Sequence, residues 1–228
     1  AGCAQCSTTF LSYLLTSAPQ LKTVVLDTIA VDLAVIQAFI QASSLAADVT
    51  RRSVARRGTS VRPLTVSFKQ STISTDALLN FFTVRGPDII SLNVSSCAGF
   101  TPNALSVLTD CSRSLTHFYC NNAAALTETA LAQFVLRTPR LRVLFLSGTP
   151  AVTTRVLTFI HETCLNLSHL DVSNCTGVTR EAAGPLSQMH SLQYLDVSFT
   201  QLTAEDIQLV VNNLPRITTF AMQGVCFA

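Results

Sequence analysis

The protein contains 228 residues, of which 48% are hydrophobic and 12% charged, and its net charge at pH 7 is +2. So apolar a composition excludes an intrinsically disordered chain, and the near-neutral charge favours no polyanionic partner. No apolar run reaches the ~18 residues that a membrane-spanning helix needs. The best candidate, residues 29–40, is interrupted by Asp32 and Gln37.

Residues 1–47 already alternate between helical and extended patterns. Residues 7–19 align with residues 127–139, the helical half of a later unit, and Leu21 begins an expected strand. A helix is expected over Asp32–Ala47. Because the chain opens in the middle of a unit, we interpret it as a fragment, or the ordered part, of a longer repeat protein.

Residues 48–62 form an expected basic loop insertion within a single repeat array that we assign to residues 1–228. Three interpretations stay open: a solvated loop, a docking site for an acidic partner or nucleic acid, and a basophilic kinase site at Ser53 or Thr59. The segment lacks the aromatic residues of a platform for single-stranded nucleic acid. Its basic residues are Arg51, Arg52, Arg56, Arg57 and Arg62.

A strand-like motif of three apolar residues at spacings of three and two recurs along the chain, as in Leu167, Leu170 and Val172. From Ile89 onward the steps between units are 26, 26, 26, 25 and 25 residues. So constant a period is typical of a solenoid. The two earlier steps are 40 and 28 residues, and the first contains the basic insertion. The units begin at Leu21, Val61, Ile89, Leu115, Leu141, Leu167, Leu192 and Ile217.

The second half of each unit reads as a helix with a threonine at its start. Pro102 occupies a first helical position, where proline is best tolerated. Helix ends are expected at Cys111 and Cys164, and before Pro139 and Pro215. The expected capping threonines are Thr101, Thr127, Thr153, Thr179 and Thr203.

The pattern L-x-x-L-x-V-S-x-C-x-x-(V/F)-T, with a C-x-x-L junction at Cys164–Leu167, resembles the cysteine-containing leucine-rich repeat of F-box/LRR proteins. No F-box is visible within the 228 residues. The resemblance implies an α/β horseshoe with about eight parallel strands on the concave face and helices on the convex face. Other units replace Cys97 and Cys175 by residues such as Ala123 and Thr149, so we expect small or apolar size to matter more than sulfur.

Several of the eight cysteines recur at repeat-equivalent positions, which indicates packing rather than pairing, and reduced thiols in a cytosolic-type compartment are expected. Repeat-position cysteines such as Cys97 and Cys175 should be buried and inert. Cys3 and Cys6 form a C-x-x-C pair, but no second pair stands at zinc-ribbon spacing. We therefore expect no cofactor and no zinc site.

The residues between the apolar positions of each strand should face the concave side, because side chains alternate along a strand. In the unit that begins at Val61, three successive columns receive Pro63, Thr65 and Ser67. Aromatic rings flanked by charge are typical of protein-recognition hot spots. The competing interpretation is an ordinary repeat surface without a ligand. The candidate partner-binding residues are His117, Tyr119, Phe145, His169, Asp171, Tyr194 and Asp196.

A catalytic or metal site built from His169, Asp171 and Asp196 is disfavoured, because the repeat alone places polar residues at these positions. The sequence also contains no glycine-rich phosphate loop, H-E-x-x-H or G-x-S-x-G motif. We expect no enzyme.

The favoured function is a non-enzymatic scaffold for protein–protein interaction, a repeat subunit of a larger assembly such as a ciliary, axonemal or organellar complex. The alternative is the substrate-recognition region of an F-box-type ubiquitin ligase adaptor. Expected partners are other proteins in a multi-subunit complex, and nucleic acid is a less favoured partner through residues 51–62. An intracellular location, cytoplasmic or cytoskeletal, is expected.

Overall fold

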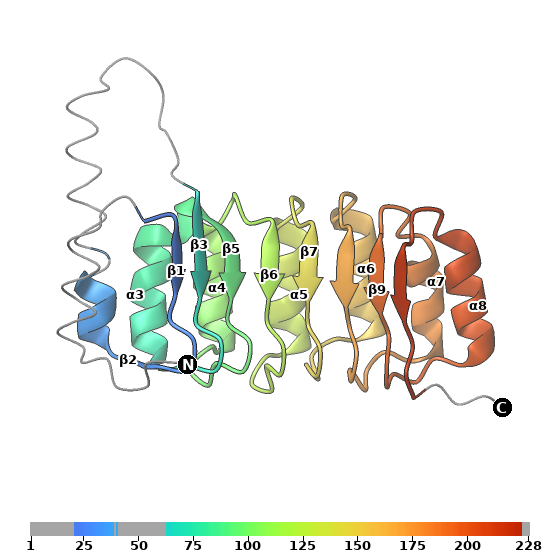
Figure 1. Ribbon diagram of the computed structural model, residues 1–228, viewed down its shortest axis with the longest axis horizontal. Helices are drawn as coiled ribbons and strands as arrows, with labels where there is room; N and C mark the ends of the chain where they lie inside the picture. Colours follow the sequence, from blue (N-terminus) through green and yellow to red (C-terminus); the bar gives the residue numbers. More distant parts are fainter. Residues whose placement is uncertain (1–20, 39, 41–62, 225–228) are drawn as a thin grey trace, which may run out of the picture.

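The computed structural model describes residues 21–38, 40 and 63–224. One parallel sheet of eight strands runs through these residues, and each strand lies beside the strand of the preceding unit (Figure 1). The helices cover one face of this sheet (Figure 1). The expected α/β solenoid is therefore confirmed. The strands are β1 (Thr23–Val25), β3 (Leu64–Ser67), β5 (Ile89–Asn93), β6 (His117–Tyr119), β7 (Val143–Phe145), β8 (His169–Asp171), β9 (Tyr194–Asp196) and β10 (Thr219–Ala221).

The helices connect the end of one strand to the start of the next. Two short strands, β2 (Ala30–Val31) and β4 (Thr72–Ile73), pair separately, and residues 33–38 are helical. No helix in the described ranges is long and apolar enough to cross a membrane. The helices are α3 (Thr75–Arg85), η1 (Gly86–Asp88), α4 (Pro102–Cys111), α5 (Glu128–Arg137), α6 (Thr154–Thr163), η2 (Arg180–Ala182), α7 (Ala183–Ser187) and α8 (Ala204–Asn213).

Hydroxyl caps begin most of these helices. Thr101, Thr127, Thr153 and Thr203 each accept a hydrogen bond from a backbone amide of the first helical turn, as expected. Thr179 is an exception, because it precedes the 3₁₀ turn η2 and its hydroxyl donates to the Glu181 carboxylate instead. Ser74 caps α3 in the same way as the four threonines, although the sequence pattern did not single it out.

The core lies between the sheet and the helices. Leu167, Leu170, Val172, Cys175 and Val178 are all at most 2% exposed. Fully burying a side chain of leucine or phenylalanine size contributes about 1.5–3 kcal/mol. A chain of ring contacts with centroids 4.6–6.2 Å apart links successive units through Phe68, Phe81, Phe82, Phe100, Phe118 and Phe134.

The backbone turns sharply after each strand at one residue in the left-handed region. These residues have φ between 54° and 71°. Glycine adopts this conformation at no steric cost and asparagine tolerates it, whereas a phenylalanine there is strained. The column reads Thr28, Gln70, Ser96, Asn122, Gly148, Asn174, Phe199 and Gly224.

The unit that begins at Val61 is two residues out of the predicted register. Leu64 pairs with Ile89, but Thr65 pairs with Ser91, so a bulge separates Leu64 from Thr65. Thr65 therefore occupies the column predicted for Pro63, and Ser67 occupies the column predicted for Thr65. The predicted step from Val61 to Ile89 was 28 residues, two more than the regular step of 26, and this excess equals the error in the predicted register.

Several predictions fall outside the described residues. They are the helical half at residues 7–19, the pair Cys3 and Cys6, the second half of the helix predicted over Asp32–Ala47, and the kinase candidates Ser53 and Thr59. The basic residues Arg51, Arg52, Arg56, Arg57 and Arg62 lie outside them as well. Where that helix begins, Asp32 accepts a hydrogen bond from the Val35 amide at 2.9 Å, as a capping residue does.

Replacing Leu170 by aspartate should destabilise the protein by more than about 4 kcal/mol, because it places a charge between stacked units. Leu165→Asp is the matched control, since Leu165 is 67% exposed and its variant should stay within about 0.5 kcal/mol of the wild type. Chemical denaturation followed by circular dichroism measures both. Equal stability of the two variants would contradict the repeat register.

Gly148→Ala should cost about 1–2 kcal/mol, because a left-handed φ disfavours any Cβ. Gly148 has φ +64°, and a Cβ there would collide with the side-chain oxygen of Asn122. Gly184→Ala is the control, since Gly184 lies in α7 and an added Cβ would contact nothing within 4 Å. That variant should be neutral or stabilised by up to about 1 kcal/mol in thermal unfolding. The opposite order of the two melting temperatures would refute the turn assignment.

Candidate protein-interaction surface

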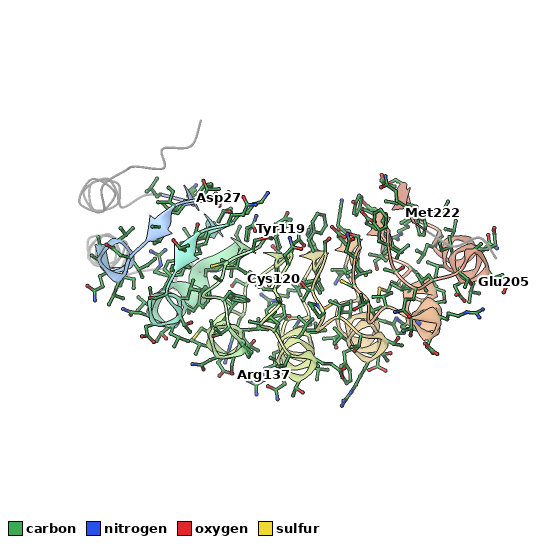
Figure 2. The ribbon with its side chains drawn as sticks, turned by 90° about the horizontal axis from the view of Figure 1, so that it is seen from below. Asp27, Tyr119, Cys120, Arg137, Glu205 and Met222 are labelled. Atoms are coloured by element: carbon green, nitrogen blue, oxygen red, sulfur yellow. The ribbon has the colours of Figure 1, made fainter. Side chains whose placement is uncertain are left out.

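The seven predicted partner-binding residues lie together on the concave face of strands β6–β9, and we call them the concave patch. One row across the sheet contains His117, His169 and Tyr194, with Val143 between the histidines. The row two residues later contains Tyr119, Phe145, Asp171 and Asp196. In Figure 2, Tyr119 points away from the helices, whereas Arg137 lies on their outer side.

Aromatic rings make the concave patch continuous across four strands. The Tyr119 and Phe145 rings meet edge to face at 5.2 Å, and Phe145 and Tyr194 stack at 5.8 Å. His169 and Tyr194 are nearly parallel, with centroids 6.0 Å apart. Because β8 separates β7 from β9, the Tyr194 ring reaches over β8 to meet Phe145. Each such ring pair is worth about 0.5–1.5 kcal/mol, so the rings hold one another in place.

The two histidines are held by the same local arrangement. The Nδ1 atoms of His117 and His169 lie 2.8 Å from the hydroxyl oxygens of Thr116 and Ser168. Each of these hydroxyls also donates to a backbone carbonyl of the preceding unit. A hydroxyl has one proton, so in the neutral form of either imidazole the ring proton is assigned to Nδ1, which leaves Nε2 as an acceptor.

The electrostatics of the concave patch change along the strands. Burial is the largest cause that lowers the pKa of His117, and the positive charge of Arg142 and the nearby His169 lower it further. The His117 ring is therefore neutral at pH 7. Burial raises the pKa of Tyr194, and the charges of Asp196 and Asp171 raise it further. The strand starts therefore carry neutral histidine beside a cation, and the strand ends carry carboxylates.

Asp171 and Asp196 each organise the turn that follows their strand. Asp171 Oδ1 accepts from the backbone amide and the hydroxyl of Ser173 at 3.0 and 2.7 Å. Asp196 Oδ1 accepts from the Ser198 amide at 2.9 Å. Burial raises the pKa of Asp171; its bonds to Ser173 oppose this rise, and the Asp196 charge adds to it.

The predicted inert cysteines are buried, but the reason for their position differs from the expectation. Burial raises the pKa of Cys97, and it raises that of Cys175 to about 11. Cys175 Sγ lies 3.2 Å from the Leu146 carbonyl of the preceding unit, and Thr149 Oγ1 donates to the equivalent Cys120 carbonyl at 3.0 Å. Size alone therefore does not govern this position, because several units place a side-chain donor there.

Two further observations bear on the chemistry of the site. Among the described residues, no group of three or more histidine, cysteine and acidic side chains is arranged to hold a metal ion. Phe199, which sequence reasoning did not single out, is 54% exposed in a left-handed turn. The signal was available in the repeat, because the other units carry polar residues or glycine at this position.

The comparisons with known proteins identify the fold. No family model matches the chain. TLR13 in a complex with ssRNA13 has a TM-score of 0.58 at 14% identity, covering 98% of this chain and 28% of that one. An internalin, inlF of Listeria monocytogenes, gives 0.56 at 14%, with 94% and 61% covered. Rad7 in the yeast Rad7–Elc1 complex gives 0.50 at 15%, with 98% and 74% covered.

The fold is that of a leucine-rich-repeat protein. At identities of 14–15% the likeness extends to the fold alone. This leucine-rich-repeat array spans 28% of the TLR13 chain, so what the whole of that protein binds is not carried over.

Asp171→Asn should stabilise the protein at pH 7 by about 0.5–1 kcal/mol, because the amide oxygen keeps both turn bonds and the desolvated charge is lost. The raised folded-state pKa means that the wild type gains stability as pH falls through that pKa. The advantage of the variant should therefore disappear below about pH 4. Melting temperatures between pH 3.5 and 8 test this.

The control for that prediction is Asp110→Asn. Asp110 is exposed on α4 and pairs with Arg137 across neighbouring helices, so the control should gain no stability at pH 7. A loss of stability in Asp171→Asn at pH 7 would mean that the turn requires the charge.

Proposed function

We propose that this protein is a non-enzymatic scaffold that binds a protein partner on the concave patch. The observation that carries the proposal is the continuous ring surface of Tyr119, Phe145, Tyr194 and His169 on the sheet face opposite the helices. Rings with polar tips supply much contact area at a low cost in conformational entropy, and they are enriched among binding hot spots. Their position on strands favours a preorganised surface.

Proteins of similar fold support the coarse part of this proposal. Rad7 was solved in a complex with Elc1, and TLR13 in a complex with ssRNA13. A macromolecular complex is therefore a natural use of this architecture. For the present protein we favour a protein over RNA, because the concave patch carries carboxylates that would repel a phosphate backbone.

We further propose an intracellular role as one subunit of a larger assembly, and the F-box adaptor role remains the alternative. The C-x-x-L junction at Cys164–Leu167, which resembles F-box/LRR proteins, favours the alternative. Affinity purification with mass spectrometry separates them. Stable recovery of one structural complex supports the assembly subunit, and recovery of a Skp1-type adaptor supports the ligase adaptor.

The double variant Tyr119→Ala/Phe145→Ala should weaken partner binding at least about tenfold, because two hot-spot rings are lost. Leu136→Ala/Leu209→Ala is the matched control, since both leucines are 49% exposed and lie on the convex helices α5 and α8. The amount of partner recovered with each purified variant gives the comparison. Binding that is lost only in the leucine variant would move the interface to the convex face.

A further inference from the structure

We propose that the concave patch binds an extended segment of a partner protein and holds one arginine or lysine side chain between Asp171 and Asp196, against the ring of Tyr194. The inference rests on the proposed function and specifies the chemistry of the partner. It is carried by the combination of an aromatic sheet face, opposite the helices, with negative charge at one place on that face.

The charge of these two side chains exceeds what the fold requires. In β5 a neutral side-chain amide makes the equivalent turn hydrogen bond, since Asn93 Oδ1 accepts from the Ser95 backbone amide at 3.0 Å. Asp171 and Asp196 accept the equivalent bonds at 3.0 and 2.9 Å. The repeat thus provides an internal control, which indicates that an amide would satisfy the turns of β8 and β9. The turns therefore do not need the two negative charges, and beyond its turn the Asp196 carboxylate also interacts with the Tyr194 side chain.

The carboxylates are also close to each other. Asp171 and Asp196 are register partners on adjacent strands, and such strands lie about 4.8 Å apart. Their mutual repulsion contributes to the raised pKa of Asp171. A cation placed between them would remove this repulsion, and it would neutralise charge that is already partly desolvated.

The rings beside the carboxylates suit the same ligand. The Tyr194 ring belongs to the strand of Asp196, and it stacks on Phe145 from the strand before Asp171. A guanidinium or ammonium group within about 6 Å of a ring face gains a cation–π attraction. The planar guanidinium can in addition stack on a ring while it bonds to carboxylates, which favours arginine over lysine.

The remaining charges give the bound segment an orientation. Arg142 stands immediately before β7, and after burial its charge is the next cause that lowers the pKa of His117, so the strand starts repel a cation. Asp171 and Asp196 end their strands. The basic residue of the partner is therefore expected over the carboxyl ends of β8 and β9, and its apolar residues over the rings of Tyr119 and Phe145.

The test selects random twelve-residue peptides displayed on phage against the full chain. Peptides that bind the wild type are synthesised, and their affinities are measured by isothermal titration calorimetry. They should be enriched in arginine and lysine, and Asp171→Asn/Asp196→Asn should weaken them about tenfold or more. Glu162→Gln/Glu205→Gln, which changes the net charge equally on the exposed convex helices, should change affinity less than about twofold.

Replacing the basic residue of a selected peptide by glutamine then closes a double-mutant cycle. Coupling between that residue and the two carboxylates supports the proposal, because the effect of one change should vanish when the other is present. Circular dichroism and melting temperature verify that the asparagine variants are folded. Their expected gain in stability separates a loss of binding from a loss of structure.

Three outcomes would overturn the inference. Peptides that lose affinity in Tyr119→Ala/Phe145→Ala but not in Asp171→Asn/Asp196→Asn would leave the proposed function standing without the cation site. Peptides indifferent to both variants would overturn the proposed function as well. A dimer of the full chain that dissociates in the aromatic variant, observed by sedimentation, would identify a second copy as the occupant.

Discussion

Each repeat unit can bury its apolar strand and helix only against the units before and after it, and the rest of the structure depends on this constraint. It requires the same backbone geometry at every junction, which is why the left-handed turn recurs from Thr28 to Gly224. It also explains the side-chain bond from Cys175 to the Leu146 carbonyl. A feature repeated in most units therefore belongs to the stacking, and only departures from the repeat are informative about binding.

The concave patch consists of such departures. Tyr119, Phe145, Asp171 and Asp196 occupy a column in which β5 carries Asn93. The asparagine shows that a neutral polar side chain satisfies this position, so the aromatic and acidic side chains there are the ones that we propose contact a partner. The raised pKa of Asp171 is consistent with this interpretation, because a desolvated carboxylate near a second carboxylate lowers the stability of the unbound protein.

The period of the sequence was sufficient to predict the fold, the parallel order of the strands and the position of the concave patch. It failed where local geometry departs from the period. Strand β3 pairs two residues away from its predicted register, and Thr179 begins a 3₁₀ turn instead of a capped α-helix. The stacking of Tyr194 over β8 onto Phe145 could not be predicted, because it depends on side-chain rotamers rather than on spacing.

The bulge at Leu64 also bears on how the array tolerates changes in length. It changes the pairing by one residue at a single junction, since Leu64 pairs with Ile89 and Thr65 with Ser91, and from β5 onward the strands pair without a further shift. Insertions before β5 therefore leave the register of strands β6–β9, which carry the concave patch, unchanged. The two parts of the molecule can consequently diverge independently in evolution, with the amino-terminal units free to vary in length while the recognition strands keep their alignment.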